Sequence, residues 1–335
     1  MQPFLGQSLE DIALWCAYNK YPETTSRKIF RWFYSRGNPD FLQMIDVSME
    51  IRNKLTKNFK TGIFSYSERN VSIDGSVKYR FQTEGGNPFE AVYLPEGKRH
   101  TLCLSIQSGC KMGCKFCRTA RLGYNGNLEV HQILNQVYSV EERKLINHIV
   151  FMGMGEPMDN FENLMKTIEV LTAEWGFAIA FRYITVSTVG VQPGLHKFLE
   201  NSRCNLALSL HSPFEDERRE LIPMEKVYPF RDLLTEMKDF KPARKRRISV
   251  QYTLIGGVND SERHLNELVS LLKDSHLKLN LISFHPFAGC DYRAPSKGTI
   301  DRFMIAMNEA GIYSTVRKSR GEDIGAACGM LGMKE

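Results

Sequence analysis

Beyond residue 99, short apolar runs alternate with longer stretches in which apolar residues recur three or four positions apart. A short apolar run is typical of a buried strand, and the longer pattern is typical of a helix with one apolar face. Repeated strand–helix units predict a parallel sheet covered by helices, so we expect an α/β fold that forms a partial (β/α) TIM-type barrel. Strands are predicted at residues 101–106, 148–152, 183–187, 206–210, 249–255, 279–284 and 313–317, and helices at residues 130–142, 163–175, 230–240, 264–273 and 300–310.

The chain before residue 99 follows two different patterns. The first is helical, with Ser8 as a candidate N-cap ahead of acidic residues. The second alternates apolar and polar side chains around glycine-containing turns, which predicts short strands and a β-hairpin extension. We therefore expect three parts: an N-terminal helical accessory domain (residues 1–60), a β-rich extension (residues 61–98) and a barrel core with a C-terminal tail (residues 99–335).

Composition narrows the class of protein. The chain has 335 residues, of which 42% are hydrophobic and 24% are charged, as in ordinary globular proteins. No apolar run is long enough to span a bilayer, and the N-terminus lacks the basic-then-apolar pattern of a signal peptide. We therefore expect a cytoplasmic protein with no membrane partner, in which the eight cysteines are reduced thiols.

The net charge of +6 is compatible with a nucleic-acid partner but does not by itself indicate one. Basic residues cluster at positions 241–247 and again at positions 317–320. On charge alone, a solvated surface is the better interpretation of each cluster. Arg27, Lys28 and Arg31 add further cations in the predicted helical domain.

Three cysteines in one loop indicate metal chemistry. Cys110, Cys114 and Cys117 lie within eight residues, and soft thiolates at this spacing suit zinc or an iron–sulfur cluster. Structural zinc sites and ferredoxin-type clusters take four protein ligands, and no second cysteine pair follows here. Three local ligands therefore predict a 4Fe–4S cluster with one iron open to a non-protein ligand. The alternatives are a non-catalytic zinc-binding module and a disulfide with a spare thiol, and a reducing cytosol disfavours the disulfide.

Other candidate residues gather where the predicted strands end. Active sites of parallel α/β folds lie at the carboxyl ends of the strands. We therefore expect one site built from the segments that follow the strands, namely the cysteine loop, residues 153–156, Ser187 with Thr188, residues 209–211 and residues 285–287.

The CxxxCxxC spacing at the end of a predicted strand resembles that of the radical S-adenosylmethionine (SAM) superfamily. Longer segments indicate one family within this superfamily, and the resemblance to that family covers nearly the whole chain. The segments that resemble the RlmN/Cfr family are residues 101–110, 114–117, 152–157, 209–213 and 317–329. Members of this family methylate an sp² carbon of an RNA adenine. RlmN proteins act at carbon 2 in 23S rRNA and certain tRNAs, whereas Cfr proteins act at carbon 8 in 23S rRNA.

The resemblance implies the cofactors. Cys110, Cys114 and Cys117 would hold a 4Fe–4S cluster, and SAM would chelate its open iron. The cofactor contributes the radical chemistry, and the protein supplies binding and orientation. Two SAM molecules would be used per turnover, one as methyl donor and one as radical source. An electron donor such as flavodoxin or ferredoxin would supply the electron.

Three further residues gain catalytic roles through the resemblance. Cys328, which alone would be interpreted as a packing thiol, matches the cysteine that accepts a methyl group and then bonds to the RNA base. Cys103 matches the cysteine that resolves this adduct by forming a disulfide with Cys328. Glu90, which alone would be interpreted as a surface carboxylate, matches the proton acceptor of the family.

The resemblance also implies a set of SAM contacts. A glycine at position 155 allows close backbone approach, and Glu156 can accept hydrogen bonds from the SAM amino group. The family commonly has asparagine where this chain has His285, which still offers one donor and one acceptor when neutral. The implied SAM contacts are Gly155, Glu156, Ser187, Ser209, Leu210, His211 and His285.

The expected function is methylation of carbon 2 of an adenosine in 23S rRNA, and in tRNA, through a methylated-cysteine intermediate. The alternatives are methylation of carbon 8 and a radical SAM reaction on a non-RNA substrate. The second alternative leaves Cys103 and Cys328 without a use. We expect a monomer in which the N-terminal helices and the basic segments hold the RNA.

Overall fold

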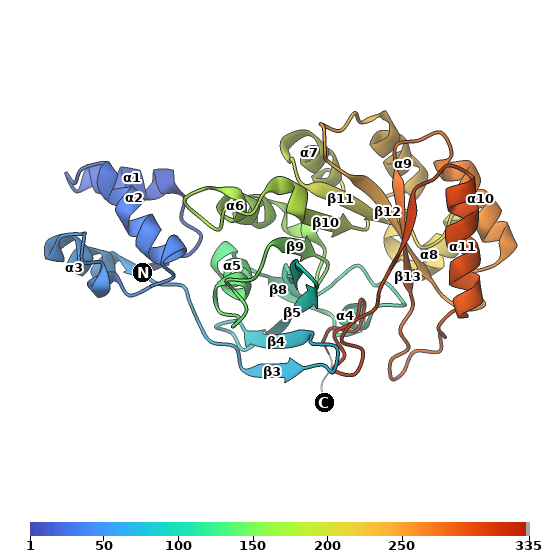
Figure 1. Ribbon diagram of the computed structural model, residues 1–335, viewed down its shortest axis with the longest axis horizontal. Coiled ribbons are helices and arrows are strands. Elements are labelled where there is room, and N and C mark those ends of the chain that lie inside the picture. Colours follow the sequence, from blue (N-terminus) through green and yellow to red (C-terminus); the bar gives the residue numbers. More distant parts are fainter. Residues whose placement is uncertain (333–335) are drawn as a thin grey trace.

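The computed structural model describes residues 1–332 of the 335-residue chain. Figure 1 shows that the N-terminal helices form a small body at one end of the molecule, whereas the remaining chain forms a larger α/β body. No helix within residues 1–332 is long and apolar enough to cross a membrane. The larger body contains the strand ends at which the sequence predicts the site.

One sheet organises the larger body, and its order among the described residues is β14-β13-β12-β11-β10-β9-β6-β5-β4-β3. Every neighbouring pair from β6 to β14 is parallel. The carboxyl ends of these strands therefore meet at one edge, and the predicted partial TIM-type barrel is confirmed. The parallel strands are β6 (Arg99–Cys103), β9 (His148–Phe151), β10 (Ile184–Thr188), β11 (Asn205–Ser209), β12 (Ile248–Leu254), β13 (Lys278–Ser283) and β14 (Ser314–Arg317).

Helices connect successive parallel strands and cover the sheet (Figure 1). Two of them, α7 (Gly194–Asn201) and α8 (Glu215–Leu221), lie where the sequence pattern predicts none. Six of the seven residues of α8 are charged, so it has no apolar periodicity. The predicted helices are present as α5 (Val130–Tyr138), α6 (Phe161–Thr172), α9 (Phe230–Asp239), α10 (Glu262–Leu272) and α11 (Lys297–Glu309).

The predicted β-rich extension continues the same sheet. β3 (Glu68–Val71), β4 (Val77–Gln82) and β5 (Pro88–Glu96) pair antiparallel in order, and β5 pairs antiparallel with β6. The extension is therefore part of the sheet that carries the site, and β3 becomes one of the two edge strands of the sheet. The domain boundaries at residues 60 and 98 stay predictions.

The N-terminal body is built on an aromatic core. Ser8 caps its first helix through reciprocal hydrogen bonds with Asp11, as the sequence predicts. Phe30 packs against Trp175 of the larger body with 4.8 Å between ring centroids, so the two bodies share apolar contacts. The helices of this body are α1 (Leu9–Tyr18), α2 (Thr24–Phe30) with its π-helical continuation (Arg31–Ser35), and α3 (Met49–Asn58).

Candidate active site

Two short strands hold the cysteine loop at the carboxyl edge of the sheet. β7 (Gln107–Gly109) pairs antiparallel with β8 (Tyr124–Asn127). The Cys110 N–H donates to the Gly123 carbonyl at 2.9 Å, which closes the loop at its base. The Lys115 N–H donates to a carbonyl at the end of α8 at 3.0 Å, which ties the tip of the loop to the barrel.

Cys110, Cys114 and Cys117 line one open cavity at the strand ends. Burial raises the pKa of the Cys110 thiol to about 12, and it also raises the pKa values of Cys114 and Cys117. Cys110 and Cys117 further raise the pKa of Cys114. Such thiols become thiolate ligands around a strongly positive metal centre. Three soft sulfur donors in one cavity fit an iron–sulfur cluster.

The loop after β9 contributes Gly155 and Glu156 to this cavity. Gly155 has a φ of +97°, and a Cβ there would lie 2.5 Å from the Cβ of Gln107, so the position requires glycine. The Glu156 carboxylate accepts hydrogen bonds from the Val189 N–H at 2.9 Å and from the Thr188 hydroxyl. Burial raises the pKa of Glu156 to about 7, although these bonds act in the opposite direction. Together with the Met158 N–H, which donates to Oε1 at 3.0 Å, these bonds leave the carboxylate a lone pair on Oε2 that can accept from an ammonium group in the cavity.

Ser187, Ser209 and His211 line the same cavity. The Ser187 hydroxyl donates to Oε1 of Gln251 at 3.0 Å and lies 3.4 Å from the Ser209 hydroxyl. Nδ1 of His211 accepts from the Thr253 N–H at 2.8 Å, so Nε2 carries the proton of the neutral ring. Burial lowers the pKa of His211 to about 3. The ring is therefore a neutral hydrogen-bond donor beside the cavity.

Arg218 supports the strand ends, and the sequence predicts no role for it. Its fully buried side chain donates to the carbonyls of Val189 at 3.0 Å, Ser209 at 3.0 Å and Leu210 at 3.1 Å. It also pairs with the buried Glu225. Leu210 is buried and is not among the described residues that line the cavity, so SAM contact by Leu210 stays a prediction.

Cys103 and Cys328 line the same cavity as the cysteine loop, although 225 positions separate them in the sequence. Cys103 ends β6 and is buried, whereas Cys328 lies in the C-terminal tail and is exposed. Burial raises the pKa of Cys103 to about 12, and Cys328 adds to the rise. Cys328 also contributes to the raised pKa of Cys117, after the larger effect of burial. Cys328 therefore shares one cavity with Cys103 and the cysteine loop, and all eight cysteines are free thiols.

Glu90 and His285 contact the C-terminal tail and are absent from the described lining of this cavity. The buried Glu90 carboxylate accepts from the Gly332 N–H at 2.7 Å, and burial raises its pKa. Nε2 of His285 is hydrogen-bonded to the Ser319 hydroxyl, and its Nδ1 lies 3.6 Å from a Glu322 oxygen. Proton transfer by Glu90 and SAM binding by His285 stay predictions.

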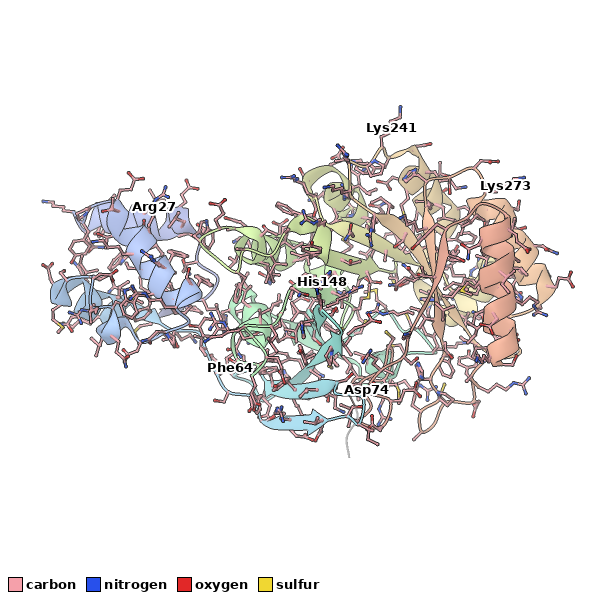
Figure 2. All side chains as sticks on the ribbon, in the orientation of Figure 1. Arg27, Phe64, Asp74, His148, Lys241 and Lys273 are labelled. Atoms are coloured by element: carbon pink, nitrogen blue, oxygen red, sulfur yellow. The ribbon has the colours of Figure 1, made fainter. Side chains whose placement is uncertain are left out.

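The basic segment 241–247 lies before the amino end of β12, away from the strand ends that form the cavity (Figure 2, Lys241). Arg246 belongs to the fold, because it donates to the carbonyls of Cys204 at 2.9 Å and Leu199 at 2.7 Å. The exposed cations of the segment are Lys241, Arg244, Lys245 and Arg247. They form a solvated surface at the amino ends of the parallel strands, whereas the site lies at the carboxyl ends.

Comparison with known proteins identifies the family. Residues 104–310 match the family model of the radical SAM superfamily. A protein of Porphyromonas gingivalis described as a probable dual-specificity RNA methyltransferase RlmN is 42% identical over 327 residues, which cover 98% of this chain and 96% of that protein. The dual-specificity RNA methyltransferase RlmN of Marinobacter nauticus is 38% identical over 318 residues, which cover 91% of this chain and 86% of that protein. The chain belongs to the RlmN family of radical SAM enzymes.

A solved member of the superfamily has the same fold as this RlmN-family chain. It is a radical SAM methyltransferase from Sphaerobacter thermophilus, with a TM-score of 0.92 and 33% identity over 98% of this chain and 99% of that one. The predicted RlmN/Cfr resemblance is therefore confirmed, and the chain is a SAM-dependent radical methyltransferase. Its cofactors are a 4Fe–4S cluster and SAM, as predicted.

The residues of this RlmN-family chain fit those cofactors. The cysteine loop offers three soft thiols, and Gly155 keeps the backbone free of a side chain that would collide with Gln107. Gln251 and Arg317 also line the cavity but were not predicted from the sequence. Arg317 ends a predicted strand and Gln251 lies within one, and a single sequence does not distinguish such polar side chains from surface residues.

Proposed function

We propose that this RlmN-family chain methylates carbon 2 of an adenosine in 23S rRNA, and in tRNA, through a methylated cysteine. The observation that carries the proposal is that Cys103 and Cys328 line the same cavity as the cysteine loop. A radical SAM reaction on another class of substrate has no use for that pair. The relatives from P. gingivalis and M. nauticus are described as dual-specificity RNA methyltransferases, which supports RNA as the substrate.

The target carbon explains why both a radical and a second thiol are required. An adenine C–H carbon is not nucleophilic, so it does not attack the methyl group of SAM directly. When bound, the cluster and SAM supply a 5′-deoxyadenosyl radical. The protein's own part is to hold a methyl group and the base close together, so that their reaction is intramolecular.

Cys328 is the residue that carries the methyl group in this proposal. Its thiolate would take the methyl group of one SAM molecule, leaving S-adenosylhomocysteine, and the S-methyl group would give a hydrogen atom to the radical that a second SAM supplies. The methylene radical would add to the adenine and join Cys328 to the RNA, with the cluster as acceptor of the one electron that this adduct must lose. The exposure of Cys328 beside the cavity supports this role, because both SAM and a large RNA must reach its sulfur.

Glu90 and Cys103 complete the reaction. Glu90 accepts the proton that leaves the adenine carbon, on a carboxylate whose Oε2 also accepts from the Gly332 N–H. Cys103 then attacks the Cys328 sulfur and breaks its bond to the methylene carbon, which takes up a proton to become the methyl group, and a Cys103–Cys328 disulfide is left. Burial raises the pKa of Cys103 to about 12 and the Arg317 guanidinium opposes that rise only in part, so the Cys103 thiol must lose its proton for the attack. A reductant restores both thiols before the next turnover.

The partners follow from this chemistry. Arg27, Lys28 and Arg31 are exposed on the N-terminal helices and offer cations to RNA phosphates. Flavodoxin or ferredoxin supplies the electron, and the protein acts as a monomer in the cytoplasm, where thiols stay reduced.

The test is mass mapping of methyladenosine isomers after anaerobically purified, cluster-loaded protein has acted on unmodified 23S rRNA and tRNA. Methylation at carbon 2 is the expected result. A product at carbon 8 would assign the Cfr-type reaction instead, and SAM cleavage with no RNA methylation would overturn RNA as the substrate. Cys328→Ala is the control variant, and continued methylation by it would overturn the covalent mechanism.

A further inference from the structure

The C-terminal tail, which follows the edge strand β14, is bound to a turn next to β3, the strand at the opposite edge of the sheet. β3 and β14 are the two edge strands, and the turn between β3 and β4 meets the tail that follows β14 (Figure 2, Asp74). Asp74 of the turn accepts from the Gly321 N–H at 2.9 Å. Asp323 of the tail accepts from the Ile73 N–H at 3.1 Å and from the Ser72 hydroxyl. The turn and the tail thus each provide a carboxylate that accepts hydrogen bonds from the other segment, and we call these contacts the turn–tail clamp.

The turn is preorganised for this contact. The Ser72 N–H donates to the Ser76 carbonyl at 2.8 Å, and the second oxygen of Asp74 accepts from the Ser76 N–H at 2.9 Å. Burial alone would raise the pKa of Asp74, but hydrogen bonds from Ser76, Gly321 and Ser72 outweigh it and lower the pKa to about 2. Asp74 is therefore ionised at neutral pH, and its bond to the tail is charge-assisted.

The tail is anchored again beyond Cys328. α4 (Arg118–Arg121) follows the cysteine loop directly, and the Arg118 N–H donates to the Gly329 carbonyl at 2.8 Å. The Thr119 hydroxyl donates to the Leu331 carbonyl at 3.0 Å. Residues 324–328 lie between these bonds and the turn–tail clamp. Cys328 therefore lies on a short strap that is attached to the edge of the sheet at one end and to the cluster-binding loop at the other.

We propose that the turn–tail clamp positions Cys328, with Asp74 and Asp323 as positioning residues for methyl transfer. The proposal rests on the function proposed above for Cys328. A chain end without such attachments frays, and a displacement of about 1 Å at a reacting group can cost about a hundredfold in rate. Loss of the clamp leaves the cluster and SAM site intact but displaces the methyl carrier. SAM cleavage then continues, while fewer cleavage events yield a methylated base.

The Asp323→Ala variant removes the carboxylate of the tail and leaves the internal bonds of the turn in place. In the full-length, cluster-loaded protein we expect faster hydrogen–deuterium exchange in residues 317–332 and unchanged exchange in β9 to β12. We also expect the ratio of 5′-deoxyadenosine to methylated RNA to rise by about tenfold. Ser72→Ala should act in the same direction but more weakly, because Asp323 still accepts from the Ile73 N–H, and the double variant should resemble Asp323→Ala.

The matched control is Asp216→Ala, which removes the same charge from an exposed position on α8 and should change neither measurement. Unaltered tail exchange in Asp323→Ala would overturn the clamp itself. Faster exchange with an unaltered product ratio would overturn its role in positioning Cys328. If the wild-type protein fails to methylate RNA, the proposed function is overturned, and the role of the clamp in positioning Cys328 is overturned with it. Hydrogen–deuterium exchange is measured without RNA, so it still decides whether the clamp exists.

Discussion

Replacing Arg218 with methionine should destabilise the protein and weaken SAM binding. The buried guanidinium pairs with Glu225 and donates to the carbonyls of Val189, Ser209 and Leu210 at 3.0 to 3.1 Å. Methionine retains much of the volume but satisfies none of these acceptors. Because the Glu225 carboxylate then loses its buried partner, the free energy of unfolding should fall by about 3–5 kcal/mol.

This loss corresponds to a measurable change in Tm. An unfolding entropy of about 2.1 cal/mol/K per residue gives roughly 0.7 kcal/mol/K for 335 residues. A loss of about 4 kcal/mol therefore lowers Tm by about 6 °C. Anaerobic calorimetry of wild type and variant measures it, and SAM titration of the same samples measures binding. We expect a weaker SAM complex because the strand ends beside the cavity lose their shared donor.

The double variant Arg218→Met/Glu225→Leu tests the cause. Removing both charges should recover most of the lost stability, since the cost comes from one unpaired buried charge. Burial raises the pKa of Glu225 and Arg218 lowers it, so Arg218→Met should raise it further. A carboxyl whose folded-state pKa exceeds its unfolded value binds protons more tightly when folded, so the deficit should shrink as pH falls toward that pKa. A Tm deficit below about 2 °C, or a double variant no more stable than the single one, would refute this reasoning.

Three further variants test the site. Cys103→Ala should accumulate protein crosslinked to RNA, visible as a nuclease-sensitive band on a denaturing gel, because the adduct lacks its resolving thiol; no such band would count against that role. Gly155→Ala should weaken SAM binding by about tenfold at unchanged iron content, because a Cβ at a φ of +97° would lie 2.5 Å from the Cβ of Gln107. An unchanged affinity for SAM would contradict the requirement for glycine at this position. Glu90→Gln keeps an acceptor for the Gly332 N–H, so hydrogen–deuterium exchange in the tail should match wild type. The glutamine accepts no proton, so methylation should fall by about 10²–10⁴-fold. A fully active variant would show that Glu90 is not the proton acceptor.

The strands and most helices could be predicted because their signal is local. β9 is a short apolar run, and α6 carries apolar residues at helical spacing. The proposed cluster ligands were also a local signal, since Cys110, Cys114 and Cys117 lie within eight residues. α8 was missed because its charged sequence gives no apolar face, although its Arg218 is fully buried.

The rest of the site depends on contacts between distant segments. Asp74 and Asp323 meet because the curved sheet brings its two edges together, and no local pattern in the sequence indicates that pairing. His285 was predicted at the correct strand end, but its observed partners Ser319 and Glu322 belong to the tail. A single sequence predicts which residues follow a strand, whereas the partner of each side chain depends on packing.

In the proposed reaction Cys328 reacts in turn with the methyl donor, the adenine base and Cys103. Cys328 lines the same cavity as Cys103 and Cys117, so it can change partners within that cavity. A tail attached at one end would search for each partner by diffusion, whereas a strap attached at both ends needs only local backbone rotation around small residues. The downstream attachment includes the bond between Gly332 and Glu90. Proton transfer to Glu90 removes the negative charge that strengthens this bond, so it loosens the strap just before Cys328 must turn toward Cys103.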